Sequence, residues 1–380
     1  MNVNGPLQSV IQRMGNNFLV ATFIPSMAFV VISSIAFGCL LPPQLRLLVS
    51  EPTQLIESGF NLLLFTTILG FTLFSLSTYI YKTFEGYTFV LGMESALRRS
   101  FLQRQRRRFI KNENARVWVE KQLVRINRRI DREGEHKPTE WRLRRQNRYI
   151  QERELLYDRQ YSLTSERNEN FPPSLQLIMP TRFGNILRSA EMYPGKRYGI
   201  DAVPLWGRLI HVIPDDAMIK IDEANNQCLF LLNSALLAGI FTILCIMVAF
   251  FGGVHLWIKA CGLSSSISCL VATLPNVFIL YMILAIFAGC TAWLFYSASL
   301  INVSQYGNMI RASYDLYRFH LLNALHLAPP VSLKEEKILW RRISYFMVGN
   351  EQWDRLDIQE TMERLSIEPN GGFEYVHKND

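Results

Sequence analysis

The sequence of 380 residues contains four long stretches without any Asp, Glu, Lys, Arg or His. They are Phe18–Leu41, Phe60–Tyr81, Cys228–Val254 and Val277–Ile301. About 20 helical residues cross the ~30 Å hydrocarbon core of a bilayer, so each stretch is long enough to span it. A soluble fold would have to bury four uncharged helices of this length in one core. The absence of charge therefore excludes an ordinary soluble domain and predicts an all-α integral membrane protein with four transmembrane helices.

The same absence excludes several transport mechanisms, because proton relays, voltage sensors and ion-coupled transporters need a charge at membrane depth. Polar residues do occur in the second stretch. On one helix Thr72, Ser75 and Tyr79 would share a face, at i, i+3 and i+7 spacing. Two interpretations stay open for this face. The hydroxyls pack against another helix, or they line a pore and replace part of an ion's hydration.

Metal-binding and catalytic motifs are also missing. The six cysteines and six histidines show no metal-ligand spacing. The chain contains no Gly-x-Ser-x-Gly, no His-Glu-x-x-His and no phosphate loop ending in Gly-Lys-Ser/Thr. We therefore expect no metal, no cofactor and no enzymatic activity. Cys261 and Cys269 lie close together in one loop, where a disulfide and two free thiols both remain open.

The cations are distributed unevenly along the chain. Of the 40 Lys and Arg residues, 28 lie within residues 82–220 and nine within residues 311–378. The loop between the first two stretches holds only Arg46, and the loop between the last two holds only Lys259. By the positive-inside rule these cation-poor loops face outward. We expect a multi-pass protein of the bacterial plasma (inner) membrane, in contact with the lipid bilayer, with both termini cytoplasmic.

The first stretch has two other interpretations, a signal peptide and a lipoprotein anchor. It is too long for a signal core, and no small-x-small cleavage site leads from it into a soluble domain. The segment Ala36-Phe37-Gly38-Cys39 resembles a lipidation box only faintly, since Phe fits poorly and the Cys comes late. We therefore expect this stretch to remain a membrane span.

The spans and the cations divide the chain into four parts: residues 1–81, 82–227, 228–303 and 304–380. The second part is basic, and with the C-terminal part it is expected to form a large helical cytoplasmic domain. Residues 94–165 within it are expected to form a helical hairpin, because apolar stripes lie on either side of a break at residues 134–138. The stripes are Val119, Leu123, Ile126 and Ile130, and Leu143, Ile150, Tyr157 and Tyr161.

Arginine dominates this basic part, with 22 Arg against six Lys, and a guanidinium can bind phosphate in a bidentate way. Two interpretations are a surface that faces solvent or lipid and a site for an anionic ligand. A juxtamembrane motif follows over residues 180–213. The candidate ligand-binding arginines are Arg104, Arg106, Arg107, Arg108, Arg182, Arg188, Arg197 and Arg208. Further on, Ser332-Leu-Lys-Glu335 is a capping box that predicts the start of a helix.

The segment from Pro180 to Leu209 reads P-T-R-x-G-N-x-L-R-x-A-E-x-Y-P-x-x-R-Y-G-I-D-A-V-x-x-W-x-R-L. It resembles an uncharacterised family of bacterial four-span membrane proteins, which also carry a region similar to Tyr306–Leu322. The resemblance covers residues 174–340 and implies the four-span layout but no activity. The layout alone is also similar to membrane effectors of anti-phage defence systems, which open a pore on a nucleotide or nucleic-acid signal.

Two functions follow from the sequence. The first is a non-enzymatic homo-oligomeric pore or channel, gated by an oligonucleotide or nucleotide that the arginine-rich cytoplasmic domain senses. The alternative is a membrane-anchored scaffold or receptor that recruits a cytoplasmic protein partner without forming a pore. An enzyme acting on lipid headgroups is a third interpretation, supported only by the polar motif next to the membrane.

Overall fold

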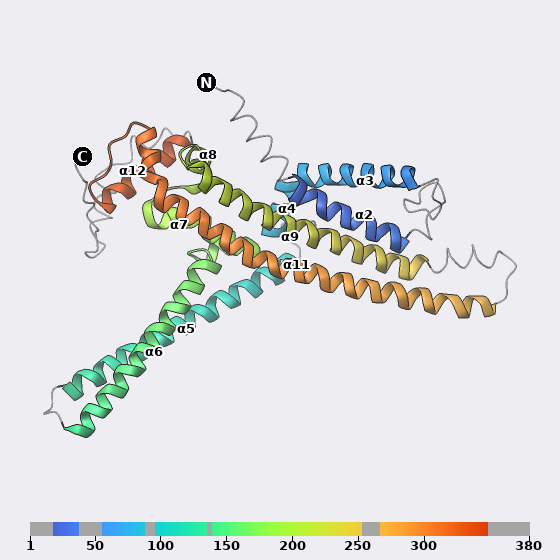
Figure 1. Ribbon diagram of the computed structural model, residues 1–380. Helices are drawn as coiled ribbons and strands as arrows, with labels where there is room; N and C mark the ends of the chain where they lie inside the picture. Colours follow the sequence, from blue (N-terminus) through green and yellow to red (C-terminus); the bar gives the residue numbers. More distant parts are fainter. Residues whose placement is uncertain (1–17, 38–54, 88–95, 135–138, 253–266, 349–380) are drawn as a thin grey trace. The chain divides into compact units, whose positions relative to one another are not determined.

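The structure is a computed structural model that describes residues 18–37, 55–87, 96–134, 139–252 and 267–348. Within these ranges every regular element is a helix and no strand occurs (Figure 1). The prediction of an all-α protein is therefore confirmed for the described residues. The loop with Cys261 and Cys269 lies outside them.

The chain divides into two compact units. Unit 1 comprises Met1–Phe84 and Asp222–Val303, and unit 2 comprises Glu85–Ile221 and Ser304–Asp380. Two long helices belong to both units, α9 (Asp215–Met247) and α11 (Ile267–Ala324). The other helices of unit 1 are η1 (Leu19–Phe23), α2 (Ile24–Phe37), α3 (Leu55–Ser75), α4 (Ser77–Glu85) and η5 (Val248–Gly252).

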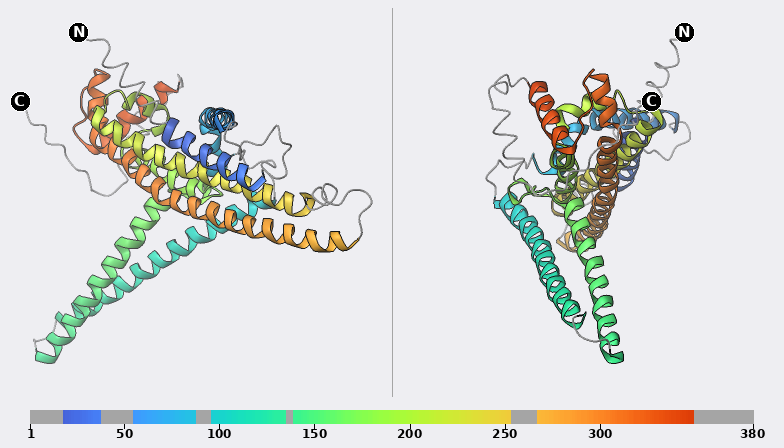
Figure 2. Two further views of the ribbon diagram at one scale, coloured as in Figure 1. Left: turned by 45° about the vertical axis from the view of Figure 1, so that its right-hand side comes forward. Right: turned by 90° about the vertical axis from the view of Figure 1, so that its left-hand side faces the viewer.

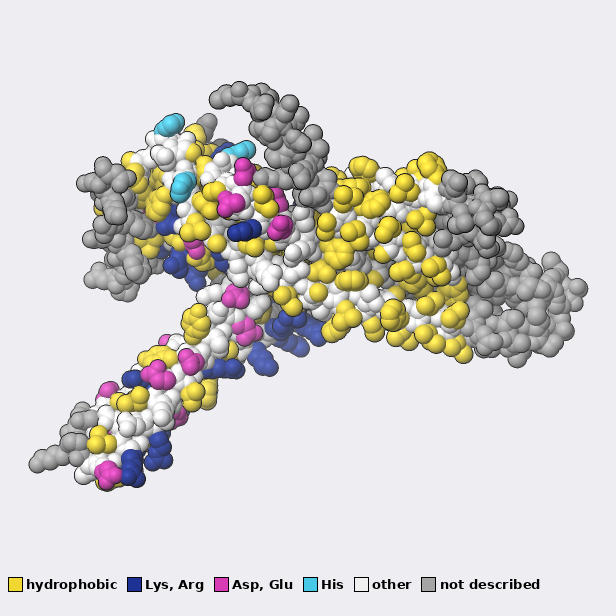
Figure 3. All heavy atoms as spheres, viewed as in Figure 1, with side chains coloured by type: hydrophobic (Ala, Val, Ile, Leu, Met, Phe, Trp, Pro, Cys, Tyr) yellow, Lys and Arg dark blue, Asp and Glu magenta, His cyan; other side chains and the backbone are white. Residues whose placement is uncertain are grey.

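Three helical segments are long and apolar enough to cross a membrane: Leu19–Phe37, Asp215–Phe251 and Phe278–Ala324. Hydrophobic side chains also cover the visible outer surface of unit 1 (Figure 3). An exposed apolar surface of this extent is typical of a protein that meets lipid. The structure thus has the helices of a membrane protein, in the segments where the sequence analysis expects the first, third and fourth spans.

The expected second span is bent in the structure. Helix α3 ends at Ser75 and α4 begins at Ser77, and the two axes differ in direction by 58°. One turn before the bend the Thr72 hydroxyl donates to the Ile68 carbonyl at 2.8 Å. Hydroxyl side chains that bond to the preceding turn favour helix bending. The pair is one broken span or a re-entrant segment, so the structure contains three or four candidate spans.

The bend separates the three candidate pore residues. Thr72 and Ser75 lie on α3, whereas Tyr79 lies on α4, so they do not form one straight face. All three side chains are exposed on the single chain.

Unit 1 has a small apolar core in which α9 and α11 meet. Phe241 and Cys245 of α9 pack with Tyr281 and Ala285 of α11. The Tyr281 hydroxyl donates to the Ala36 carbonyl at 2.7 Å and so links α11 to α2. In the same unit the amide of Asn233 donates to the Ala21 carbonyl in the π-helical turn η1, also at 2.7 Å. Such bonds satisfy polar groups in apolar surroundings and fix the helices against one another.

Unit 2 contains a long helical hairpin. Helices α5 (Ala96–Gly134) and α6 (Glu140–Asn170) pack against each other as two long neighbouring helices (Figures 1 and 2). Val119 and Leu123 of α5 form a buried cluster with Leu163 of α6. These two helices occupy residues 96–134 and 140–170, where the sequence analysis expects a hairpin over residues 94–165, and the predicted stripe of α5 is on its inner face.

The predicted stripe of α6 is wrong. Leu143, Tyr157 and Tyr161 are exposed, with Tyr161 at 78%. The inner face of α6 instead carries Leu156 and Leu163 and ends at the buried Arg167. This face includes polar and charged side chains, so a search for apolar periodicity selects the wrong side of the helix.

Beyond the hairpin, unit 2 contains η4 (Leu175–Leu177), α7 (Arg182–Tyr198), α8 (Ala202–Leu209) and α12 (Leu333–Met347). The predicted capping box opens α12, since Ser332 accepts from the Glu335 backbone N–H and Glu335 accepts from that of Val331.

The Pro-Thr-Arg-Phe-Gly-Asn segment builds the start of α7. Thr181 caps the helix by accepting from the Gly184 N–H at 2.9 Å, and its hydroxyl donates to the Glu85 carbonyl at 3.0 Å. The fully buried Asn185 exchanges hydrogen bonds with both the N–H and the carbonyl of Met179. Gly184 lies against the chain at Glu85, where an added Cβ would be 2.2 Å from the carbonyl oxygen. These motif residues therefore have structural roles.

We predict that Gly184→Ala destabilises the protein by about 1–3 kcal/mol, because the new methyl group has no room beside the Glu85 backbone. Gly207→Ala is the matched control. Gly207 is also helical, but no atom lies within 4 Å of its added Cβ, so the change should be neutral or stabilising by up to about 1 kcal/mol. Thermal unfolding of the detergent-solubilised chain measures both, and equal midpoints would contradict the packing argument.

Candidate anion-binding site

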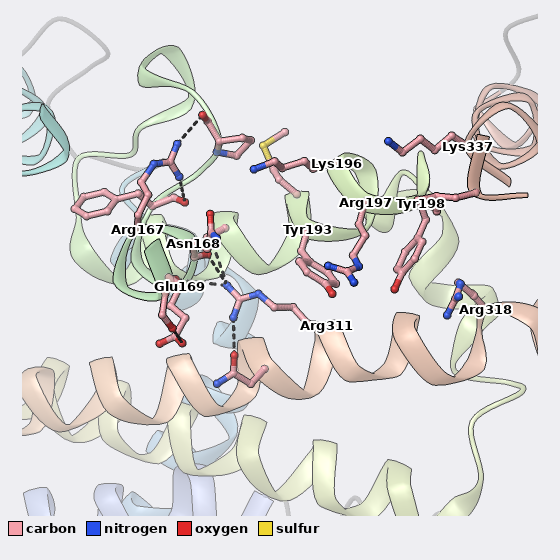
Figure 4. Close-up of a pocket in the computed structure, with 17 residues that line it drawn as sticks. Arg167, Asn168, Glu169, Tyr193, Lys196, Arg197, Tyr198, Arg311, Arg318 and Lys337 are labelled. Carbon is pink, nitrogen blue, oxygen red and sulfur yellow. Dashed lines mark hydrogen bonds between the residues drawn. The ribbon is translucent and has the colours of Figure 1, made fainter. Parts of the chain in front are cut away.

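Unit 2 contains a cavity of about 820 Å³, a size typical of small-molecule sites (Figure 4). Its walls come from the C-terminal end of α6 and the residues after it, from α7, from the unit 2 part of α11 and from α12. Six cationic side chains line the cavity, against the single carboxylate of Glu169. They are Arg167, Lys196, Arg197, Arg311, Arg318 and Lys337.

Arg311 joins α11 to the segments on the opposite wall. Its guanidinium donates to Asn308 Oδ1 at 2.6 Å, to Ser189 Oγ at 2.9 Å and to the Asn168 carbonyl at 3.3 Å. The Ser189 hydroxyl in turn donates to the same Asn168 carbonyl. Figure 4 shows this arginine reaching from α11 to Asn168 and Glu169. Arg311 is therefore held by protein acceptors, and it fixes this wall.

Arg167 closes the end of α6. Its guanidinium donates to the Pro173 carbonyl at 2.7 Å and to the Phe171 carbonyl at 3.3 Å, and it lies 4.6 Å from the centre of the Phe109 ring. Burial lowers the pKa of this guanidinium, and the nearby Glu113 carboxylate acts in the opposite direction. This arginine mainly orders the chain that follows α6.

A buried ion pair connects α11 to α12. Arg318 Nε lies 2.7 Å from Oε1 of Glu336, whose side chain has no exposed surface. Trp340 Nε1 donates to the same oxygen at 3.3 Å, and Arg318 also donates to the Asp315 carbonyl. A carboxylate can be buried this deeply only when a cation and hydrogen-bond donors replace its hydration.

Two tyrosines hold the carboxylate of Asp315. The Tyr198 hydroxyl donates to Oδ1 at 2.6 Å and the Tyr193 hydroxyl to Oδ2 at 3.0 Å. Burial raises the pKa of both phenols, and the contact with Asp315 raises it further, so both remain protonated donors. The Arg197 guanidinium lies 5.9 Å from the centre of each ring.

The six cations therefore differ in their surroundings. Arg167, Arg311 and Arg318 are each held by at least two protein acceptors. Lys196 and Lys337 have no hydrogen-bond or ion-pair partner among the described residues, and both lie on the side of the cavity away from α11 (Figure 4). Arg197 lies over the rings of the two tyrosines and also interacts electrostatically with the Asp315 carboxylate that they hold. The two lysines thus have no carboxylate to neutralise them.

The structure brings few of the sequence-predicted arginines together. Arg197 lines the cavity and is itself exposed, whereas Arg104, Arg106, Arg107 and Arg108 are exposed on α5 and do not line it. Arg108 and Arg182 border a second cavity of about 50 Å³ that also contains Glu166.

Arg188 and Arg208 have contacts within the protein. Arg188 lies 3.7 Å from the Glu191 carboxylate and donates to the Tyr87 hydroxyl at 3.3 Å. Arg208 donates to the Pro204 carbonyl at 2.6 Å. These two bind the protein itself.

Sequence reasoning missed Arg167, Lys196, Arg311, Arg318 and Lys337. A signal was present, because both regions that carry the family resemblance contribute to the cavity. The first supplies Lys196 and Arg197, and the second supplies Arg311 and Arg318. Only the fold shows that the two regions meet.

Among the described residues, no group of three or more His, Cys, Asp and Glu side chains could hold a metal ion. Comparison of the chain with protein-family models, with curated proteins and with solved structures gave no match. The family resemblance therefore remains a prediction from the sequence, and the site is argued from its geometry alone.

We predict that Glu336→Ala destabilises the protein by about 3–5 kcal/mol, because it leaves the Arg318 charge buried without its partner. The double variant Arg318→Met, Glu336→Leu removes both charges and should recover much of that loss. Thermal unfolding of the full chain in detergent separates the two cases. A double variant no more stable than Glu336→Ala would contradict the electrostatic explanation.

Proposed function

We propose that the protein is a ligand-gated membrane pore without enzymatic activity. Unit 1 crosses the bacterial inner membrane and assembles with further copies. Unit 2 lies in the cytoplasm, and an anionic ligand in its cavity changes ion permeation through unit 1. The observation that carries this proposal is that the cavity is lined by Lys196 and Lys337, which have no partner among the described residues, and by Arg197, which follows Lys196 in the sequence. Cations without an acidic partner that line a concave surface attract anions, because their fields add in the hollow.

Helix α11 supports a connection between the ligand and the membrane. It is uninterrupted from Ile267 to Ala324 and carries both an apolar segment that begins at Phe278 and the cavity residues Arg311 and Arg318. A displacement of the helix at the cavity can therefore be passed along a rigid element. The uneven distribution of cations supports four spans with both termini in the cytoplasm, the bent pair α3–α4 being the second span.

The proposed pore lies between copies of the chain. Thr72, Ser75 and Tyr79 are exposed on unit 1, so their hydroxyls belong to the surface that is available to a second copy. In this arrangement they would line the pore without any fixed charge.

One observation favours the alternative function, a scaffold. The hairpin exposes large apolar side chains next to its arginines, including Trp118, Trp141, Leu155 at 70% and Tyr161 at 78%. Aromatic and arginine side chains are enriched where proteins bind partners. A scaffold of this kind forms a stable complex in a pull-down and carries no ion flux.

Ion flux through liposomes that contain the purified protein tests the proposal. We expect flux that responds to ATP or to short single-stranded oligonucleotides and that responds less at higher salt, because salt screens the cationic site. Charge reversal of Arg104, Arg106, Arg107 and Arg108 serves as the comparison. It abolishes the response only if the exposed arginines of α5 bind the ligand. Absence of flux from folded, inserted protein under every condition would favour the scaffold.

A further inference from the structure

The cavity of unit 2 has a composition that narrows the class of its ligand. Besides its cations it is lined by the apolar side chains of Phe171, Pro173, Met192 and Leu333. An inorganic anion would contact the charges and leave this apolar surface unused. A ligand that uses both kinds of lining has a negatively charged part and an organic part.

Helix dipoles explain only part of the cationic charge. Lys196 and Arg197 lie in the last turn of α7, where the partial negative charge of the helix end favours cations in any protein. Lys337 lies near the start of α12, directly after the acidic first turn, where the dipole disfavours a cation. Its ammonium is nevertheless without a partner among the described residues and faces the cavity (Figure 4). Lys337 is half-buried, and an anion bound in the cavity would offset the unfavourable helix dipole at this position.

The walls that carry these cations are already packed together. An added Cβ on Gly199, which ends α7 with a φ of 80°, would lie only 2.5 Å from the Lys337 carbonyl oxygen of α12. The ion pair of Arg318 and Glu336 fixes α12 to α11. The helices that form the walls of the cavity are therefore already held together without a ligand, and binding has to order only the cationic side chains that contact it.

The geometry points to an organic phosphate of nucleotide size, with at least two negative charges, held by Lys196, Arg197 and Lys337. A guanidinium and two ammonium groups match the oxygens of one or more phosphate groups. The volume of about 820 Å³ admits a nucleotide but no folded nucleic acid. This inference rests on the proposed function, which places an anionic ligand in the cavity. It adds the chemical class of that ligand and the residues that bind the ligand.

Binding of ATP to the purified full-length chain in detergent, in the presence of EDTA, tests this inference by calorimetry. Two probes each remove one part of ATP: adenosine has no phosphate, and inorganic phosphate has no organic part. We expect ATP to bind about tenfold more tightly than either, since adenosine lacks the charge-assisted contacts and inorganic phosphate lacks the apolar contacts, and about 1.4 kcal/mol corresponds to a factor of ten. Equal affinity for ATP and inorganic phosphate would overturn the inference.

Charge reversal at one position of α12 locates the site. Lys337→Glu should weaken ATP binding by about tenfold or more, and Lys196→Glu should act in the same direction. Lys334→Glu is the matched control, because Lys334 is exposed on the same helix, is not part of the cavity lining and should leave binding unchanged. Lys337→Gln is a milder second variant that removes the charge without reversing it and should also weaken ATP binding. Circular dichroism checks that every variant is folded. ATP binding that survives Lys337→Glu but is lost on reversal of Arg104, Arg106, Arg107 and Arg108 overturns the inference.

A phosphate ester can also come from a lipid headgroup, so a second arm uses nanodiscs with and without phosphoinositide phosphates. If the protein binds nanodiscs that contain phosphoinositide phosphates and Lys337→Glu abolishes this binding, the same site is supported and the membrane is identified as the source of the phosphate ester. The outcome is independent of ion flux. ATP binding without any flux response overturns the gated pore and leaves the ligand site intact. A flux response to ATP that is unchanged in Lys337→Glu overturns the ligand site and leaves the gated pore.

Discussion

The burial of the Glu336 carboxylate is the constraint on which the geometry of unit 2 depends. With no exposed surface, this group is stable as a charge only while Arg318 and Trp340 replace its water. The pair therefore fixes α12 to α11, and α12 in turn brings Lys337 to the cavity. The tyrosine pair on Asp315 does the same for α7. Internal charges are neutralised within the walls, and the surplus cations remain in the space between them.

Much of the fold was predictable because it depends on composition and periodicity. Absence of charge located the apolar helices, and the stripe of α5 and the capping box of α12 were found correctly. The bend at Leu76 was missed, because no proline marks it in the sequence. The inner face of α6 was missed because it includes Arg167, which compensates its burial with carbonyl oxygens and a phenylalanine ring.

The candidate site was less predictable for a different reason. The high density of arginine in the sequence predicted a ligand site on α5, but Arg104, Arg106, Arg107 and Arg108 are exposed there and do not line the 820 Å³ cavity. The cavity instead collects cations from the four helices α6, α7, α11 and α12, and no short segment of sequence contains more than two of them. Only their arrangement in space distinguishes Lys337, which faces the cavity, from Lys334 one turn earlier, which does not. The sequence analysis correctly predicted that unit 2 is rich in arginine, but it did not predict which cations line the cavity.

The order in which the chain is made gives the position of α12 a further meaning. The first cavity residues precede α9 in the sequence, and the last, Lys337, follows α11. During synthesis every apolar helix therefore leaves the ribosome before α12 can supply Glu336. Until then Arg318 has no carboxylate partner on α12, and the wall that holds Lys337 is absent. The site can therefore be completed only after the chain has been translated through α12.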